Sequence, residues 1–183
     1  AHMTIDKMPM LDMVNVTDAT KMFFGSQIKE IKIKNTHNIK YANYMFTNCI
    51  NIQQIDELDL SGSKNFRGLF RDCSKITSII NLNILKCDSA VDMFMGCSSL
   101  KTLSFTTIPL ISNGSNMFDN CRRLQHIPMI DTSTSTNING MFGNCHSLKT
   151  IPMLDTSNVT NLSYTFFECR MLKTIPLLDT SKV

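Results

Sequence analysis

The chain has 183 residues, a formal net charge of +3, 43% hydrophobic residues and 18% charged residues. This composition predicts a folded chain and excludes an intrinsically disordered one. The small net charge does not favour a nucleic-acid partner, and no apolar run approaches the roughly 18 residues of a membrane span. We interpret residues 1–3, Ala-His-Met, as a tag remnant, and residues 4–183 as one domain.

One short pattern recurs along the chain at a constant interval. A residue that is apolar in all but the last copy is followed by Phe, two further residues and Cys. The copies are MFTNC at 45–49, LFRDC at 69–73, MFMGC at 93–97, MFDNC at 117–121, MFGNC at 141–145 and TFFEC at 165–169. An earlier copy, MFFG at 22–25, lacks the Cys. A strict period of this length indicates coils that bury their apolar faces against one another.

Positions of equal phase in such a stack form ladders. Apolar residues stand three and six positions after each Cys and form two further rows. Ile5 and Met8 supply the members of these two rows in a still earlier coil. The predicted Phe ladder is Phe23, Phe46, Phe70, Phe94, Phe118, Phe142 and Phe166. The predicted Cys ladder is Cys49, Cys73, Cys97, Cys121, Cys145 and Cys169.

Within one coil, three elements follow in chain order. The segment SLKTIPM, residues 147–153, has apolar residues at the spacing L-x-x-I-x-M, and its last part alternates like a short strand. LDTS, residues 154–157, has the residues of a turn. VTNLSYTFFEC, residues 159–169, has apolar residues at steps of three and four, which predict a short helical segment capped by Thr160 or Asn161. The expected fold is therefore an α/β solenoid of about seven and a half 24-residue coils, with parallel strands on one side and helical segments on the other.

A proline shares one phase in four coils, directly after the strand core. Proline has no N–H to donate and is disfavoured inside a sheet. We therefore predict strands of about four residues that end at the proline, and somewhat longer pairing where another residue takes its place. The prolines are Pro9, Pro128, Pro152 and Pro176, and the replacing residues are Lys32, Asp56, Ile80 and Ser104.

The pattern C-x-x-L-x-x-I-P-x-L-D-T-S-x-V-T-N-x-x-x-M-F resembles the BspA-like, or Treponema-type, leucine-rich repeats. These occur in bacterial surface proteins and lipoproteins and in some bacteriophage-encoded proteins. The resemblance covers residues 5–183. The coils containing NLNILKCDSAVD and SFTTIPLISNGSN keep the 24-residue period but lack the DTSNVTN motif. It implies a leucine-rich-repeat solenoid used for adhesion or protein recognition, without catalysis.

Two residues per coil lie between the Leu and Ile rows and form the predicted exposed strand face. This face is polar, mildly basic and free of aromatic residues. Either it docks a partner, as solenoid faces commonly do, or it is a solvated sheet face. The candidate binding residues are Lys29, Gln53, Lys101, Thr102, Gln125, His126, Lys149, Thr150, Lys173 and Thr174.

Two further rows have competing interpretations. The Cys row predicts buried, reduced thiols, although neighbouring coils are close enough for disulfides; metal binding is not expected, because no C-x-x-C spacing occurs. The Asp row either satisfies its own turn amides or binds a cation such as calcium, and the first interpretation is favoured. Its members are Asp12, Asp59, Asp131, Asp155 and Asp179.

No constellation of catalytic residues is visible. His37, His126 and His146 share no phase, and none stands at a motif spacing from a Ser or Cys. A basic cluster at 29–40 fits a solvated strand edge better than an anion site. We expect neither an enzyme nor a cofactor nor a nucleic-acid partner.

The expected function is recognition or adhesion through the solenoid surface, on a cell surface or virion, with a host or cell-surface protein or glycan as partner. One alternative is an intracellular, cytoplasmic protein-interaction scaffold, encoded by a phage and interfering with a host complex, which unpaired thiols fit. Another alternative is a structural spacer. The chain stops at Val183 in mid-coil. We therefore expect a longer native protein, or an end-to-end contact at the uncapped last coil.

Overall fold

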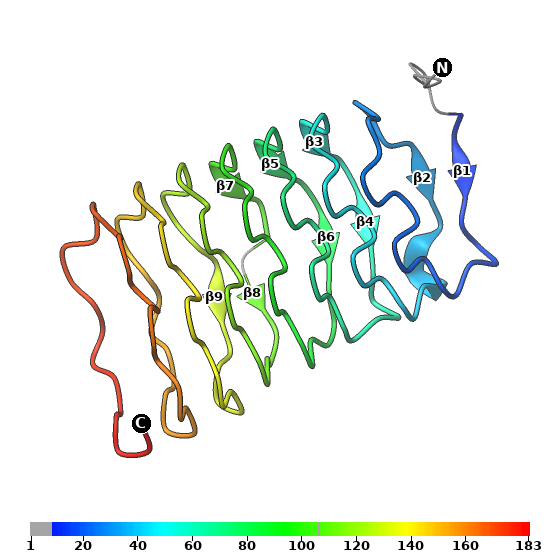
Figure 1. Cartoon of the computed structure of the whole chain (residues 1–183). Helices are drawn as coiled ribbons and strands as arrows, with labels where there is room; N and C mark the ends of the chain where they lie inside the picture. The colour runs from blue at the N-terminus through cyan, green and yellow to red at the C-terminus, as the bar shows by residue number, and fades with distance from the viewer. Residues whose placement is uncertain (1–8, 106) are drawn as a thin grey trace.

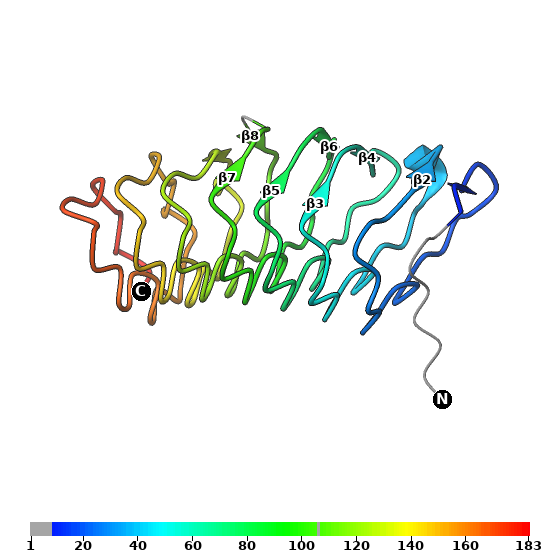
Figure 2. The same ribbon diagram turned by 90° about the horizontal axis from the view of Figure 1, so that it is seen from above.

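The computed structural model describes residues 9–105 and 107–183, so the tag remnant and the rung of Ile5 and Met8 lie outside the described residues. The chain winds as a row of coils stacked side by side from the N-terminal to the C-terminal end (Figure 1). Seen from above, short strands lie on one side of the stack and a zigzag of turns on the other (Figure 2). Over the described residues, no helix is both long and apolar enough to cross a bilayer.

The strands are two residues long and pair in parallel between coils. β3 (Gln54–Ile55), β5 (Ser78–Ile79) and β7 (Thr102–Leu103) form a three-stranded sheet. The two-stranded pairs are β1 (Leu11–Asp12) with β2 (Ile33–Lys34), β4 (Leu58–Asp59) with β6 (Leu82–Asn83), and β8 (Thr107–Ile108) with β9 (Met129–Ile130). The one helix that the described residues contain is the 3-10 helix η1 (Thr36–Asn38).

The residue at the proline position of each coil explains where the strands β3, β5 and β7 form. The N–H of Ile80 donates to the carbonyl of Ile55 at 2.9 Å, and the N–H of Ser104 donates to that of Ile79 at 3.3 Å. Proline cannot make this bond. Strand pairing precedes Asp56, Ile80 and Ser104, as expected, but the strands are half the predicted length, and no strand precedes Lys32. The coils that carry Pro128, Pro152 and Pro176 have no strand before the proline.

The predicted helical segments are not helices; each is a series of tandem turns. In the coil around Phe118, the N–H groups of Met117, Asp119 and Cys121 each donate to the carbonyl three residues earlier, at 3.0–3.1 Å. The N–H groups between them donate to the next coil, as Phe118 does to Met141 at 2.9 Å. Every second amide therefore joins two coils, whereas a helix would use nearly all of its amides internally.

Two left-handed residues per coil make these turns possible. They lie four residues apart, and the second stands directly before the Cys position. Asn, Asp and Gly predominate because they adopt positive φ most readily. The pairs are Lys21 and Gly25, Tyr44 and Asn48, Gly68 and Asp72, Asp92 and Gly96, Asn116 and Asn120, Gly140 and Asn144, and Tyr164 and Glu168.

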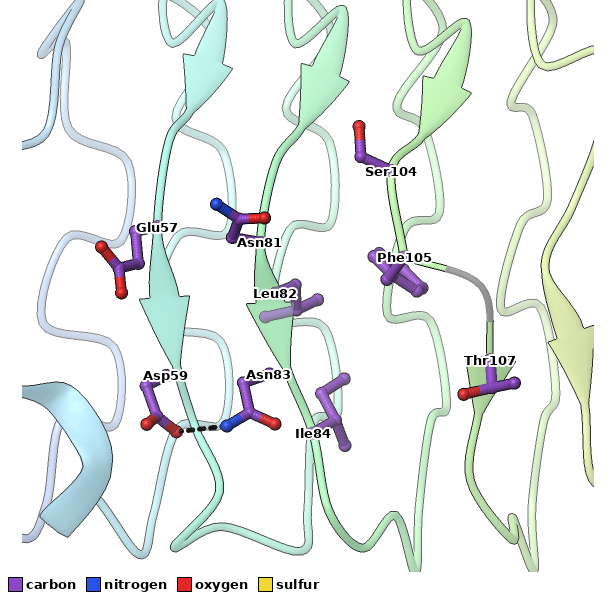
Figure 3. Close-up of a pocket in the computed structure, with 9 residues that line it drawn as sticks. All are labelled: Glu57, Asp59, Asn81, Leu82, Asn83, Ile84, Ser104, Phe105 and Thr107. Carbon is purple, nitrogen blue, oxygen red and sulfur yellow. Dashed lines mark hydrogen bonds between the residues drawn. The ribbon is translucent and has the colours of Figure 1, made fainter.

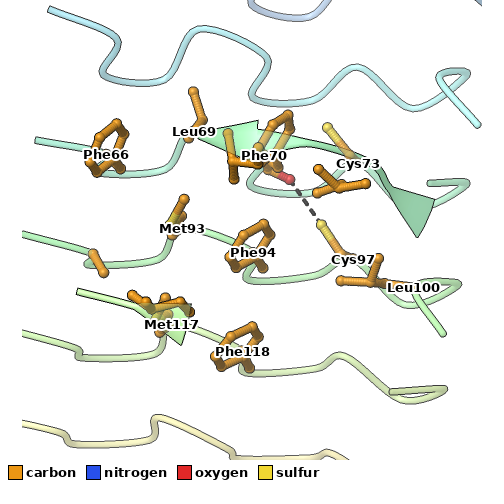
Figure 4. Packing of buried hydrophobic residues seen from close by; sticks show 14 of the residues in the cluster. Phe66, Leu69, Phe70, Cys73, Met93, Phe94, Cys97, Leu100, Met117 and Phe118 are labelled. Atoms are coloured by element: carbon orange, nitrogen blue, oxygen red, sulfur yellow. Dashed lines mark hydrogen bonds between the residues drawn. The ribbon is translucent and has the colours of Figure 1, made fainter. Parts of the chain in front are cut away.

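The core lies between the strand side and the turn side. The rings of the Phe row stack along the whole molecule, with centroids of neighbouring rings 5.2–6.0 Å apart. Figure 4 shows Phe70, Phe94 and Phe118 in this stack, with Cys73, Cys97 and Leu100 beside them. Each coil thus buries its apolar residues against two neighbours, which is the stabilising unit of a repeat stack.

The register departs from 24 residues in two places: at the N-terminal end, where Leu11 pairs with Ile33, and in one coil in the middle of the stack. Ser78 pairs with Thr102, a full period further along the chain, whereas Thr107 pairs with Met129, which stands two positions short of a full period. Past this point the stack returns to the period, because Asn113 bridges Asn137. The irregular coil contains SFTTIPLISNGSN, one of the two segments that lose the common wording.

Candidate recognition edge

The predicted binding residues lie at the corner where the chain passes from the turn side to the strand side. In the sixth copy of the corner, Leu148 is buried and Ile151 is half-buried, so Lys149 and Thr150 between them face solvent. The spacing L-x-x-I therefore anchors two apolar residues and exposes the pair between them. Repeated in every coil, these corners form the upper edge of the stack in Figure 1, and Figure 2 looks down on it.

All ten predicted binding residues are exposed on this upper edge. Backbone bonds hold consecutive rungs together: the N–H of Thr77 donates to Gln53, that of Lys101 to Thr77, and that of Lys149 to Gln125, at 2.8–3.1 Å. The residues so placed are Lys29, Gln53, Lys101, Thr102, Gln125, His126, Lys149, Thr150, Lys173 and Thr174. They form a row and not a cluster, because each coil contributes the same two positions.

Few side chains of the row contact one another directly. Nδ1 of His126 lies 3.3 Å from Oγ1 of Thr150, and Oγ1 of Thr77 donates to the carbonyl of Gln53 at 3.1 Å. Lys149 and Lys173 occupy adjacent coils, whereas Lys101 is separated from them by the coil of Gln125. Such a row suits contact with an extended partner and provides no enclosed cavity for a small molecule.

Sequence reasoning overlooked a second basic row on the same edge. We define the basic edge as residues 74–79, 98–103, 122–127, 146–151 and 170–175, which are the corner segments of five consecutive coils. It contains no Asp or Glu. Its Lys and Arg residues are Lys75, Lys101, Arg122, Arg123, Lys149, Arg170 and Lys173. The missed signal was the pair of positions directly after each Cys, where Lys75, Arg122 and Arg123 stand.

An exposed apolar row runs on the strand side, beyond the proline phase. Met129, Met153 and Leu177 are 64%, 71% and 90% exposed. The spacing L-x-x-I-x-M included the position of Met153 among the apolar residues of the strand. The structure shows that its side chain is exposed. The chain turns at the proline, so the following side chain points outward and the next one, such as Leu154, is buried.

The Cys row is structural. The thiol of Cys97 donates to the carbonyl of Phe70 at 3.1 Å (Figure 4). Every other member of the Cys row, Cys49 and Cys169 included, donates in the same way to the Phe carbonyl of the preceding coil, at 3.0–3.1 Å. All seven cysteines are free. Burial raises the pKa of Cys49 to about 11 and that of Cys87 to about 12. Thiols held so far from ionisation are poor nucleophiles and poor metal ligands.

The Asp row caps its own turns. Oδ1 of Asp155 accepts the N–H of Ser157 at 3.0 Å and its hydroxyl at 2.7 Å, and these bonds lower the pKa of Asp155. Asp12, Asp59, Asp131 and Asp179 accept the N–H two residues later in the same way. Over the described residues, no group of three His, Cys, Asp or Glu side chains could hold a metal ion.

An open groove of about 480 Å³ lies beside the irregular coil (Figure 3). Glu57 and Asp59 line it on one side, and Ser104 and Phe105 on the other. Nδ2 of Asn83 donates to Oδ1 of Asp59 at 3.2 Å, which ties the carboxylate to the neighbouring coil, and the N–H of Ser61 in its own turn donates to the same oxygen. The groove therefore has polar walls without a nucleophile and base in contact, the pairing that covalent catalysis needs.

Two family models match the sequence. A model described as a BspA type leucine rich repeat region, with 6 copies, matches residues 90–183, just over half of the chain. A model described as a Mycoplasma protein of unknown function matches residues 2–107. Neither the curated proteins nor the solved structures gave a significant match.

Proposed function

Because the chain belongs to the BspA-type leucine-rich-repeat family, we propose that it is a non-enzymatic recognition or adhesion module. In this proposal the stacked coils form a solenoid that binds a macromolecular partner, a host or cell-surface protein or glycan. The binding surface is the upper edge with its ten exposed residues.

The observation that carries the proposal is the construction of this edge. Each coil presents two polar side chains between two apolar anchors, and backbone bonds join the rung of Gln53 to that of Thr77, Thr77 to Lys101, and Gln125 to Lys149. Side chains on such a frame are held in place before a partner arrives, which lowers the entropic cost of binding. The long, open shape matches a large partner better than a small substrate.

The proposal puts the module on a cell surface or a virion, and it is supported by the family, since BspA-type repeat proteins are usually surface or secreted proteins. A second candidate, an intracellular interaction scaffold, is favoured by one observation: all seven cysteines are free. Free thiols are common in reducing compartments, and disulfides in oxidising ones. Locating the native protein in fractionated cells distinguishes the two placements, because recovery in the cytosolic fraction supports the scaffold and recovery at the surface supports adhesion.

Binding to arrays of host proteins and glycans tests the proposal. Lys101, Lys149 and Lys173 are replaced together by Gln, the residue that Gln53 and Gln125 already provide in this row. We expect a ligand that binds the unmodified chain and is lost by this triple variant. A ligand whose binding is unchanged in the variant, with both proteins folded by circular dichroism, would contradict the role of the edge.

A further inference from the structure

The charge of the basic edge is largely uncompensated. Arg170 is paired with Glu168, whose carboxylate lies 2.7 Å from its Nε. Lys75 donates to the amide oxygen of Asn51, and Arg122 to that of Asn120. No carboxylate of the described residues lies within ion-pairing distance of the remaining six cations. These are Lys75, Lys101, Arg122, Arg123, Lys149 and Lys173.

The arrangement of these cations is linear. They belong to corners in five consecutive coils, and the stacked rings place neighbouring coils 5.2–6.0 Å apart. Between the cations stand hydroxyl and imidazole groups, from Ser78 and Thr102 to His126 and Thr150. A strip of like charges on a stiff frame raises the local concentration of an anionic polymer that lies along it.

The backbone of the edge excludes one class of partner. A peptide that adds as a strand needs a free row of N–H and C=O groups. Here the N–H groups of Thr77, Lys101 and Lys149 already bond the preceding coil. The edge also provides no aromatic anchor of the kind that dominates most protein interfaces.

The side chains of the edge disfavour single-stranded nucleic acid. Proteins that bind it combine positive charge with aromatic rings on which the bases stack. The five segments of the basic edge contain no Phe, Tyr or Trp. Lysine ammonium groups and hydroxyls instead match sulfate, carboxylate and sugar hydroxyl groups, which need hydrogen bonds and charge but no stacking.

We propose that the basic edge binds a linear acidic polysaccharide, with its sulfate or carboxylate groups lying along the six uncompensated cations. This inference deepens the proposed recognition function and rests on it. The interaction is chiefly electrostatic, since the edge is exposed and flat, so each contact releases a bound counterion and weakens with added salt.

Dextran sulfate and neutral dextran are matched probes for this site. We expect the chain to bind immobilised dextran sulfate at low salt and not to bind dextran. The Lys101→Gln, Lys149→Gln, Lys173→Gln variant binds about tenfold or more weakly, and its slope of log affinity against log salt falls by about half, because three of six cations are gone. The control variant is Lys40→Gln, Lys64→Gln, Lys86→Gln, which removes equal charge from exposed positions off the edge and retains binding.

Any one of three results overturns the inference. The chain binds neutral dextran as strongly as dextran sulfate, or both variants lose the same affinity for dextran sulfate. The third is that duplex DNA displaces bound dextran sulfate at a lower concentration than free dextran sulfate does. Failure here is separable from failure of the proposed function. Suppose that a protein from the host array binds the chain and not the edge variant, while the chain does not bind dextran sulfate. The proposed recognition function then stands, and the inference that its ligand is a polysaccharide is rejected.

Discussion

Each thiol of the Cys row fills core volume and also satisfies a buried carbonyl of the preceding coil. Each Phe carbonyl on the turn side already accepts the N–H of the residue three positions later, as Phe70 does from Cys73 at 3.1 Å. The thiol from the next coil adds a second hydrogen bond to the same oxygen, and a typical hydrogen bond contributes about 0.5–1.5 kcal/mol. The cysteines thus recur along the repeat for a hydrogen bond between coils.

Replacing Cys97 by Ala should destabilise the fold by about 1–3 kcal/mol, through a lost hydrogen bond and a small cavity. Cys97→Ser keeps a donor and should cost less. Urea unfolding measures both. Cys169→Ala is the matched control, because that thiol is only half-buried, and its loss should be smaller. A Cys97→Ala variant as stable as the unmodified chain would show that the thiol and its bond contribute nothing.

The native thiols should react in order of exposure. Burial raises the pKa of Cys49 to about 11 and that of Cys87 to about 12, so their thiolate fractions at neutral pH are minute. Cys169, the least buried, should react first with a disulfide reagent, and all seven should react at once in denaturant. Mass spectrometry after alkylation identifies the sites. Early labelling of Cys97 would contradict the described packing.

At the scale of elements, the tandem turns depend on their left-handed residues. Asn48 has φ 60° and an exposed side chain. A residue with a branched Cβ strongly disfavours this region, at roughly 1–2 kcal/mol, while Gly and Asn adopt it. The turns are therefore coded by residue type at two positions per coil and not by helical propensity.

Asn48→Gly should leave the unfolding free energy nearly unchanged, whereas Asn48→Val should lower it by about 1–2 kcal/mol. Because the side chain is exposed, packing changes little in either variant. Denaturant titrations of the two variants provide the comparison. A valine variant as stable as the glycine variant would mean that the turn relaxes without strain.

The Asp turns should make stability depend on pH below neutrality. Hydrogen bonds from Ser157 lower the pKa of Asp155 in the folded chain, and those from Ser181 lower that of Asp179. A carboxyl with a depressed folded pKa stabilises above its unfolded value, near 4, and this contribution is lost as pH falls through the folded value. Asp155→Asn keeps the accepting oxygen and should flatten part of this dependence. An NMR titration that placed the pKa of Asp155 above the ordinary value of an aspartate would refute this.

The sequence predicted which rows are apolar far better than which backbone connects them. Steps of three and four predicted helices around Phe166, but alternating turns bury residues at the same steps, and only the left-handed residue before each Cys distinguishes the two. The strands expected to end at the prolines were wrong: no strand precedes Pro128, Pro152 or Pro176, and β9 begins directly after Pro128. The outward Met129 and the basic row at Arg122 escaped prediction, because the chain direction at a corner is not encoded in apolar spacing.

At the scale of the whole molecule, stability is a sum over neighbouring coils. Each coil contacts only the coils before and after it, through the Phe stack and the amides that cross between coils. A register change is tolerated locally, as at Thr107 and Met129, because the ladders recover the period within the same coil.

Deleting residues 122–145, one full period, should give a folded chain, since Cys121 would then be followed by His146 in the same phase. Its denaturant m-value should fall roughly in proportion to the lost coil, because m follows the surface exposed on unfolding. Deleting residues 122–133, half a period, places apolar and polar phases opposite one another. A cooperative transition in this second variant would argue against strict phase stacking.

The amides that run from coil to coil have a mechanical consequence. Their hydrogen bonds lie along the axis of the stack. A force that pulls the two ends apart therefore breaks the bonds between one pair of neighbouring coils before those of the next pair. The chain should therefore yield by peeling, releasing one coil at each step at a modest, repeated force. A tether built in this way lengthens under load while its remaining coils keep their shape, and it re-forms by rewinding onto the coils still in place.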